Sequence, residues 1–304
     1  MPESELTRTN KPQKLKYMVT RNKPKPPFKL KAMRYSIHAL TLLSPPLAAR
    51  FVNYLWFKTQ RYPEPRREQK VLETAEWKII TFEKKTIQLY IWGSRSKPTV
   101  LLVHGWNGRG AQLGDFVNGL VEQGYRVIAF DAPGHGRSST NSTSLPEISR
   151  VIQTLSQQYG PFKAGIAHSF GGLCLMHAIS TAGVKTNKVV CIASAFNAER
   201  LVQVFAKILQ VQPQIVERQK RLLERQFGEN VWEQFSMPHM VSTTSSVGLI
   251  IHDEDDDAIP VERSKLIAGA WRGSKLVLTT GLGHRRILRD KTVINKVISF
   301  ITTE

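Results

Sequence analysis

The sequence contains few cysteines, few acidic residues and, before Gly93, no glycine. Its two cysteines, Cys174 and Cys191, both stand in apolar runs. A disulfide framework is therefore excluded, and nothing indicates an oxidising compartment. Nine of the 16 prolines fall within residues 1–70, where glycine is absent. We interpret this change of composition as a domain boundary near residue 70.

Acidic residues are heavily outnumbered, with 24 Asp and Glu against 43 Lys and Arg and a net charge of +19. The imbalance is strongest in residues 1–34, which hold ten basic and two acidic residues. We expect a solvated, disordered arm there, and the alternative is a polybasic contact with anionic membrane lipid. No RNA- or DNA-binding motif accompanies the arm, so specific binding of nucleic acid is not expected.

Long apolar runs are also lacking. Residues 35–57 form the only candidate for a membrane span, but they contain a histidine, an arginine, an asparagine and a Pro-Pro pair. A spanning helix tolerates few such groups, and the long basic lead does not resemble a signal peptide. We therefore expect an amphipathic helix from about Pro46, whose apolar face is formed by Leu47, Phe51, Val52, Leu55 and Trp56.

This helix either docks on the folded domain, which we favour, or lies in a membrane interface beside the basic arm. The corresponding expectation is a cytoplasmic protein, with peripheral contact to an anionic membrane through residues 1–60 as the alternative. The first 70 residues are thus predicted to form a basic, Pro-rich arm with one helix, and residues 71–304 to form the main domain.

Beyond residue 70, apolar runs alternate with helical patterns. Strands are expected at 77–82, 87–92, 99–103, 126–130, 164–168, 188–194, 247–251 and 275–279, the first two being antiparallel. Helices are expected at 115–123, 146–158, 171–182, 261–270 and 291–302. This alternation predicts an α/β fold, a mostly parallel sheet covered by helices on both faces. Residues 196–246 interrupt it with a helical insertion, positioned as a cap over a site.

The strongest motif is AHSFGG at residues 167–172, between an expected strand and an expected helix. It approximates G-x-S-x-G, in which small residues permit a strained turn that presents a nucleophilic serine at a helix N-terminus. Ala167 replaces the first glycine and is small enough to serve. The motif favours Ser169 as a nucleophile, and by itself it also fits a simple strand-helix turn with an incidental serine.

Three further motifs follow expected strands. HGWNG at 104–108 has small residues that allow a backbone N–H, that of Trp106, to point into the site beside the N–H of Phe170. HDEDDDAIP at 252–260 offers several carboxylates, and we favour one of them as a catalytic acid over a cation site. GLGHRRIL at 281–288 places His284 beside two glycines at a strand end, and these glycines allow the loop to reach back into the site. The order Ser, Asp, His is the one expected for a nucleophile elbow.

With these motifs, and with DAPGHGRS at 131–138, residues 75–302 resemble the α/β-hydrolase fold superfamily of serine hydrolases. Aligning Pro260 with the family's proline places the triad acid at Asp256, puts Asp253 at a usual glycine position and leaves Asp257 as the nearest rival. The family's helical cap corresponds to residues 196–246. The first 70 residues lie outside the resemblance.

The resemblance implies two-step acyl transfer. Ser169 attacks a carbonyl, His284 takes its proton, Asp256 orients the imidazole, and the N–H groups of Trp106 and Phe170 form the oxyanion hole. No cofactor or metal is needed, and the expected partner is a small-molecule acyl substrate. His104, His168 and His252 are interpreted as structural. The alternatives are a non-catalytic binding protein on the same fold and a membrane-peripheral hydrolase of acyl lipids.

Overall fold

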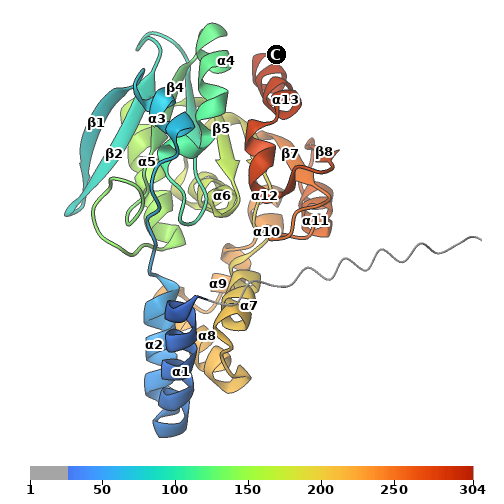
Figure 1. Ribbon diagram of the computed structural model, residues 1–304. Helices are drawn as coiled ribbons and strands as arrows, with labels where there is room; N and C mark the ends of the chain where they lie inside the picture. Colours follow the sequence, from blue (N-terminus) through green and yellow to red (C-terminus); the bar gives the residue numbers. More distant parts are fainter. Residues whose placement is uncertain (1–26, 304) are drawn as a thin grey trace, which may run out of the picture.

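The computed structural model describes residues 27–303, which build an eight-stranded sheet covered by helices on both faces (Figure 1). The strands are β1 Glu76–Phe82, β2 Lys85–Trp92, β3 Thr99–Val103, β4 Arg126–Phe130, β5 Phe162–His168, β6 Thr186–Ile192, β7 Val247–Asp253 and β8 Lys275–Thr279. Their order in the sheet is β1-β2-β4-β3-β5-β6-β7-β8. Strand β2 is antiparallel to both of its neighbours, and β3 to β8 are parallel. The predicted mostly parallel α/β fold is confirmed.

Two helical layers sandwich the sheet. One contains α5 Leu145–Tyr159, α6 Phe170–Ala182, α10 Met237–Ser242 and α11 Glu262–Ala270. The other contains α3 Arg66–Leu72, the 3-10 helix η1 Gly110–Phe116, α4 Val117–Glu122, α12 Gly283–Arg286, the 3-10 helix η2 Ile287–Arg289 and α13 Lys291–Thr302. Strand β3 shows why its sequence is continuously apolar: Leu101 and Val103 face the first layer, and Val100 and Leu102 face the second.

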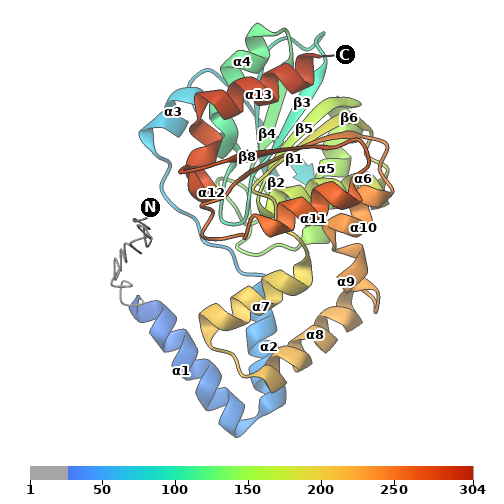
Figure 2. The ribbon, with the colours of Figure 1, turned by 90° about the vertical axis from the view of Figure 1, so that its right-hand side faces the viewer.

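A separate helical lobe lies beyond the carboxyl ends of the parallel strands (Figures 1 and 2). It contains α1 Phe28–Leu43, α2 Pro45–Trp56, α7 Ala198–Leu209 and α8 Pro213–Phe227, and the short α9 Val231–Gln234 leads back to the sheet. Its core contains Ile37, Val52 and Ile215, and the Arg34 guanidinium donates two hydrogen bonds to the Ile208 carbonyl at 3.0 and 2.8 Å. The lobe, called the cap below, thus joins the expected insertion to two N-terminal helices.

Helix α1 corrects the expectation of a disordered arm for residues 28–34. Leu30, Met33, Ile37 and Leu40 follow helical spacing, and this inner face packs into the cap core. The rest of the arm, residues 1–26, lies outside the described residues. Within residues 27–303 no helix is both long enough and apolar enough to cross a membrane.

Other differences are small. The expected helix at 115–123 is preceded by η1, so the helical region begins at Gly110, and α3 was not expected. Strand β6 ends at Ile192 rather than at residue 194, because Ala193 adopts a φ of +46°, which breaks the extended backbone.

Candidate active site

Ser169 occupies a strained turn between β5 and α6. Its φ of 54° and ψ of −122° are uncommon for a residue with a side chain. The turn requires glycine on its helical side: a Cβ on Gly171 would lie 2.5 Å from the His104 carbonyl oxygen, and one on Gly172 would lie 2.0 Å from Ser194 Oγ. Gly171 and Gly172 of the AHSFGG motif therefore allow α6 to start directly against the ends of β3 and β6.

The structure brings Ser169, His284 and Asp256 together in one hydrogen-bonded chain. His284 Nε2 lies 3.1 Å from Ser169 Oγ, and its Nδ1 lies 2.8 Å from Asp256 Oδ2. The three residues come from the β5–α6 turn, the loop after β7 and the start of α12, all at the carboxyl edge of the sheet. Asp257, the rival acid, is exposed and has no hydrogen bond to a described residue.

The carboxylate of Asp256 is fully buried, and both of its oxygens are occupied. Oδ1 accepts hydrogen bonds from the backbone N–H groups of Ala258 and Ile259, each at 2.8 Å. Oδ2 faces both His284 and, at 3.3 Å, His252 Nε2. Burial raises the pKa of Asp256, but hydrogen bonds from His252, His284 and Ile259 outweigh it and hold the pKa below its usual range. The group is therefore ionised at neutral pH.

His252 is one residue whose part in the site the sequence did not reveal. Its ring is fully enclosed, as a structural residue requires, with Nδ1 2.6 Å from Ser264 Oγ and Nε2 2.9 Å from the Ile259 carbonyl oxygen. The same Nε2 faces Asp256, however, so the ring also holds the acid. No sequence signal distinguishes this role, because His252 is simply the next-to-last residue of a buried strand.

Asp253 is a second such residue. Its buried carboxylate accepts four hydrogen bonds, from the N–H groups of Asp255, Leu282 and Gly283 and from the Thr279 hydroxyl, at 2.7 to 3.1 Å. Burial raises the pKa of Asp253, but these hydrogen bonds outweigh it and hold the pKa below its usual range. Asp253 thereby ties the end of β7 to the loop that carries His284. Its place at the family's usual glycine position was the one hint in the sequence.

The loop after β3 lies against the serine turn. A Cβ on Gly105 would come 3.1 Å from the Ser169 Cβ, and the Trp106 ring meets the Phe170 ring edge-on at 5.2 Å. Asn107, at φ 57°, donates its N–H to His135 Nε2 at 3.0 Å. Among residues 27–303, neither the N–H of Trp106 nor that of Phe170 has an acceptor.

Three other buried histidines surround this loop as neutral rings. Burial lowers the pKa of His104 to about 4 and those of His135 and His168 to about 3. His104 Nε2 accepts a hydrogen bond from the Ala132 N–H, and His168 Nε2 lies 2.9 Å from the His284 carbonyl oxygen. They hold the backbone around the site, as interpreted for His104 and His168. Within residues 27–303, no cluster of His, Cys, Asp or Glu side chains is arranged to hold a metal ion.

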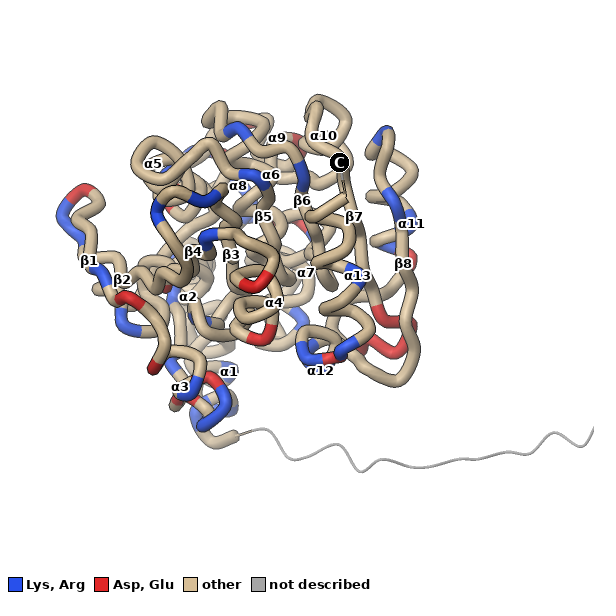
Figure 3. The backbone as a smooth tube through the Cα atoms, turned by 90° about the horizontal axis from the view of Figure 1, so that it is seen from above, with Lys and Arg blue, Asp and Glu red and all other residues tan. Residues whose placement is uncertain are grey.

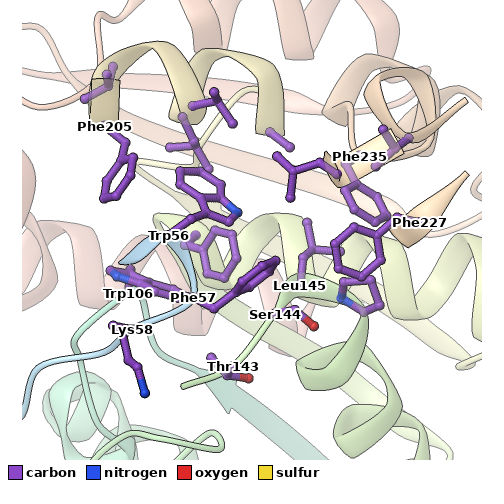
Figure 4. A pocket seen from close by; sticks show the side chains of 18 of the residues that line it. Trp56, Phe57, Lys58, Trp106, Thr143, Ser144, Leu145, Phe205, Phe227 and Phe235 are labelled. Atoms are coloured by element: carbon purple, nitrogen blue, oxygen red, sulfur yellow. The ribbon is translucent and has the colours of Figure 1, made fainter. Parts of the chain in front are cut away.

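Two cavities of different character meet at Ser169. The first, about 230 Å³, lies between the sheet and the cap, and Figure 4 shows its rings converging. Aromatic and aliphatic side chains dominate its wall, among them Trp56, Phe57, Trp106, Leu145, Phe205 and Phe235. The second, about 360 Å³, lies between α3, the loop after β3 and α12, and is largely polar. Ser169 and Trp106 line both cavities, whereas His284 lines only the second.

Comparison with known sequences gives one family match and several partial relatives. A model described as "Alpha/beta hydrolase family" matches residues 100–296. The human "Serine hydrolase-like protein" is 36% identical over 90 residues, which cover 27% of this chain and 42% of that protein. An uncharacterized abhydrolase domain-containing protein of Dictyostelium discoideum is 32% identical over 108 residues, 33% of this chain and 11% of that protein. The chain thus matches less than half the length of each relative.

Solved structures share the fold at low sequence identity. A thioesterase domain from the curacin biosynthetic pathway has a TM-score of 0.59 at 21% identity, covering 75% of this chain and 99% of its own. A putative lipase from Acinetobacter baumannii has a TM-score of 0.61 at 18% identity, with coverages of 79% and 97%. A membrane phospholipase A has a TM-score of 0.59 at 16% identity, with coverages of 90% and 97%. Likeness at these identities establishes the fold alone.

Proposed function

The chain belongs to the alpha/beta hydrolase family, and we propose that it is a serine hydrolase that cleaves a carboxylic ester or a related acyl bond. One observation carries the proposal: Ser169 Oγ, His284 and the buried carboxylate of Asp256 form a continuous hydrogen-bonded chain beside an apolar cavity. A nucleophile, a base and a group that orients the base are the parts that acyl transfer requires.

In the proposed mechanism, Ser169 Oγ attacks the acyl carbonyl while His284 Nε2 takes its proton. Asp256 keeps the proton on Nδ1, so that Nε2 is the free base, and it stabilises the imidazolium that forms. The N–H groups of Trp106 and Phe170 donate hydrogen bonds to the developing oxyanion. Neither N–H donates to another residue of the described chain, which supports this role. His284 then protonates the leaving group and activates the water that releases the acid.

The test is hydrolysis of p-nitrophenyl esters of increasing chain length by the wild type and by Ser169→Ala. We expect kcat to fall by about three orders of magnitude or more, since the members of a triad act as a unit. Ser180→Ala, on the exposed side of α6, is the matched control and should leave the rate unchanged. A folded wild type that hydrolyses no ester, thioester or amide would instead favour the alternative of a non-catalytic binding protein.

A second candidate, a membrane-peripheral hydrolase of acyl lipids, is favoured by the outer face of α1. Phe28, Tyr35 and Leu42 stand seven residues apart on that helix and are 85%, 75% and 72% exposed. Lys29 and Lys31 flank this apolar stripe, a pattern that suits an anionic membrane surface.

Vesicle co-sedimentation tests this candidate. The full chain should bind vesicles that contain phosphatidylglycerol more strongly than pure phosphatidylcholine vesicles, and Tyr35→Ser/Leu42→Ser should weaken that binding. The inner face of α1 is untouched by these changes, so the cap remains packed. Leu266→Ser, an exposed position on α11, is the control. Equal sedimentation of the double variant and the wild type would contradict membrane contact through α1.

A further inference from the structure

The two cavities that meet at Ser169 have different chemical roles if the proposed function holds, and the following inference rests on that function. In acyl transfer the acid that protonates the leaving group must reach it, so the leaving group lies on the side of His284. His284 lines the polar cavity and is absent from the wall of the apolar one. This places the acyl chain in the apolar cavity under the cap and the leaving group in the polar cavity.

The polar cavity carries an excess of positive charge. Among the residues that the structure describes, its wall contains Arg67, Arg109, Arg285 and Arg289 and one acidic side chain, Glu68. Glu68 is buried and already paired, since Arg109 donates to its carboxylate and Arg67 lies 3.4 Å away. In Figure 3 the basic segments of α3 and α12 lie toward the same side of the molecule.

Arg285 and Arg289 are the arginines of this wall whose guanidinium groups are available to bind a ligand. Both are exposed, and neither has an ion pair or a side-chain hydrogen bond with any residue in the described part of the chain. Arg286, between them, differs: it donates to the Leu282 and Gly281 carbonyls and so belongs to the loop itself. Guanidinium groups without partners at the rim of a cavity suit a phosphate, whose oxygens accept several charge-assisted hydrogen bonds.

Two residues that line the same cavity each carry a buried acceptor without a donor. His168 is 2% exposed and uses Nε2 toward the His284 carbonyl, so its unpartnered Nδ1 is a lone-pair acceptor. Gln112 Oε1 is likewise buried without a partner. Nδ1 lies against Gly105 and Oε1 against Gly108, so both acceptors stand behind the loop after β3, which forms one wall of the cavity.

We propose that the substrate is an ester or thioester whose leaving group is a phosphate-bearing alcohol or thiol, with Arg285 and Arg289 binding the phosphate. In the first step the Ser169 O–acyl bond forms and the carbonyl carbon's bond to the leaving oxygen or sulfur breaks. The serine proton passes through His284 to that atom. Water then releases the acid and restores Ser169.

The test compares matched substrates that share an octanoyl chain. Octanoyl-coenzyme A is paired with S-octanoyl-N-acetylcysteamine, and 1-octanoylglycerol 3-phosphate is paired with 1-octanoylglycerol. We expect the phosphate-bearing member of at least one pair to have the higher kcat/KM. The pair that shows the preference identifies the leaving group as a coenzyme-like thiol or as a glycerophosphate.

The variant Arg285→Gln/Arg289→Gln should reduce that ratio of kcat/KM values by about tenfold or more, the loss expected for charge-assisted hydrogen bonds. Arg95→Gln/Arg272→Gln removes the same charge at exposed positions outside the cavity and should keep the ratio. A wild type that hydrolyses the neutral substrates without preferring phosphate, or a preference retained by Arg285→Gln/Arg289→Gln, would overturn this inference alone. Absence of all turnover would overturn the proposed function together with it.

Discussion

His252 and Asp256 face each other with fully enclosed side chains, His252 Nε2 lying 3.3 Å from Asp256 Oδ2. The same oxygen contacts His284 Nδ1 at 2.8 Å, so two imidazoles converge on one carboxylate. Ser264 and the Ile259 carbonyl hold the His252 ring, and this ring in turn lies against the Asp256 carboxylate. The orientation of His284 therefore depends on a residue that does not touch Ser169.

Replacing His252 should show this dependence. In His252→Ala, the buried Asp256 carboxylate, the Ser264 hydroxyl and the Ile259 carbonyl all lose a partner. We expect the free energy of unfolding to fall by about 2–4 kcal/mol and kcat to fall by about tenfold. Urea denaturation and ester hydrolysis measure the two effects, with His38→Ala, an exposed position on α1, as control. An unchanged kcat in a destabilised His252→Ala would limit the residue to a structural role.

Replacing each candidate acid, Asp256 or Asp257, by asparagine should have clearly different effects on kcat. In Asp256→Asn the charge beside His284 is lost and the wrong imidazole tautomer is favoured, so kcat should fall by about 10³ to 10⁴. Asp257→Asn changes an exposed side chain and should stay within about twofold of the wild type. Steady-state kinetics on one ester decides between them, and equal losses in both variants would contradict the assignment of the acid.

Asp253→Asn tests whether the four hydrogen bonds at the end of β7 position the catalytic loop. An amide cannot accept all four, and its NH₂ group would face backbone N–H groups of the loop before His284. We expect a loss of about 2–3 kcal/mol of stability and a lowered kcat. Glu254→Gln, exposed beside it, is the control. If kcat kept its wild-type value, the loop would not need this anchor for catalysis.

The buried neutral histidines predict a loss of stability in mild acid. The pKa of His135 is about 3 in the folded protein and about 6.5 in an unfolded chain, so only the unfolded chain takes up the proton in between. Stability is therefore fully present above pH 6.5 and falls as the pH drops toward 3, by about 1.4 kcal/mol per pH unit for each such group.

In His135→Gln, the free energy of unfolding should fall less steeply between pH 5.5 and 4, by about 1.4 kcal/mol per pH unit. Denaturant titrations at several pH values measure the slope. His38→Gln, on the exposed face of α1, should keep the wild-type slope. A slope that His135→Gln leaves unchanged would show that His135 does not titrate as a buried neutral ring.

Narrowing the apolar cavity should change the preferred acyl length. Ala198 lies at the start of α7 on the cavity wall, and Ala198→Phe would fill part of the roughly 230 Å³ beside Ser169. We expect kcat/KM for short p-nitrophenyl esters to rise relative to kcat/KM for long ones. Leu201→Ala, which widens the same cavity, should have the opposite effect and favour longer esters. Shifts in the same direction for both variants would place the acyl chain elsewhere.

Much of the sheet and the positions of its motifs followed from the sequence, because buried parallel strands are continuously apolar and end in loops with distinctive residues. Ser169 and His284 stood out by their flanking glycines. The supporting contacts of Asp253 and His252 did not, since each depends on which backbone N–H or ring lies opposite after folding. A single buried acid or histidine looks the same in sequence whether it has one partner or four.

The N-terminal helix α1 could not be predicted from the sequence for a different reason. Leu30, Met33, Ile37 and Leu40 have helical spacing, but they lie among lysines and follow a Pro-rich stretch, so composition favoured a disordered arm. Helix α1 packs mainly against α2, and its Arg34 also reaches the Ile208 carbonyl of α7, 174 residues away in sequence. Local pattern reveals neither contact, so tertiary packing decided the structure of this segment.

The cap is built from the beginning of the chain and from a segment made much later, which has a consequence during synthesis. Helices α1 and α2 leave the ribosome before α7 and α8 exist, and at 5 to 20 residues per second the interval is roughly 10 to 30 seconds. During it α1 and α2 have only each other, and the parts of their inner faces that later contact α7 and α8 have no partner. We therefore expect nascent chains that end before residue 198 to be bound by chaperones through residues 28–57, and chains completed beyond α8 to be released.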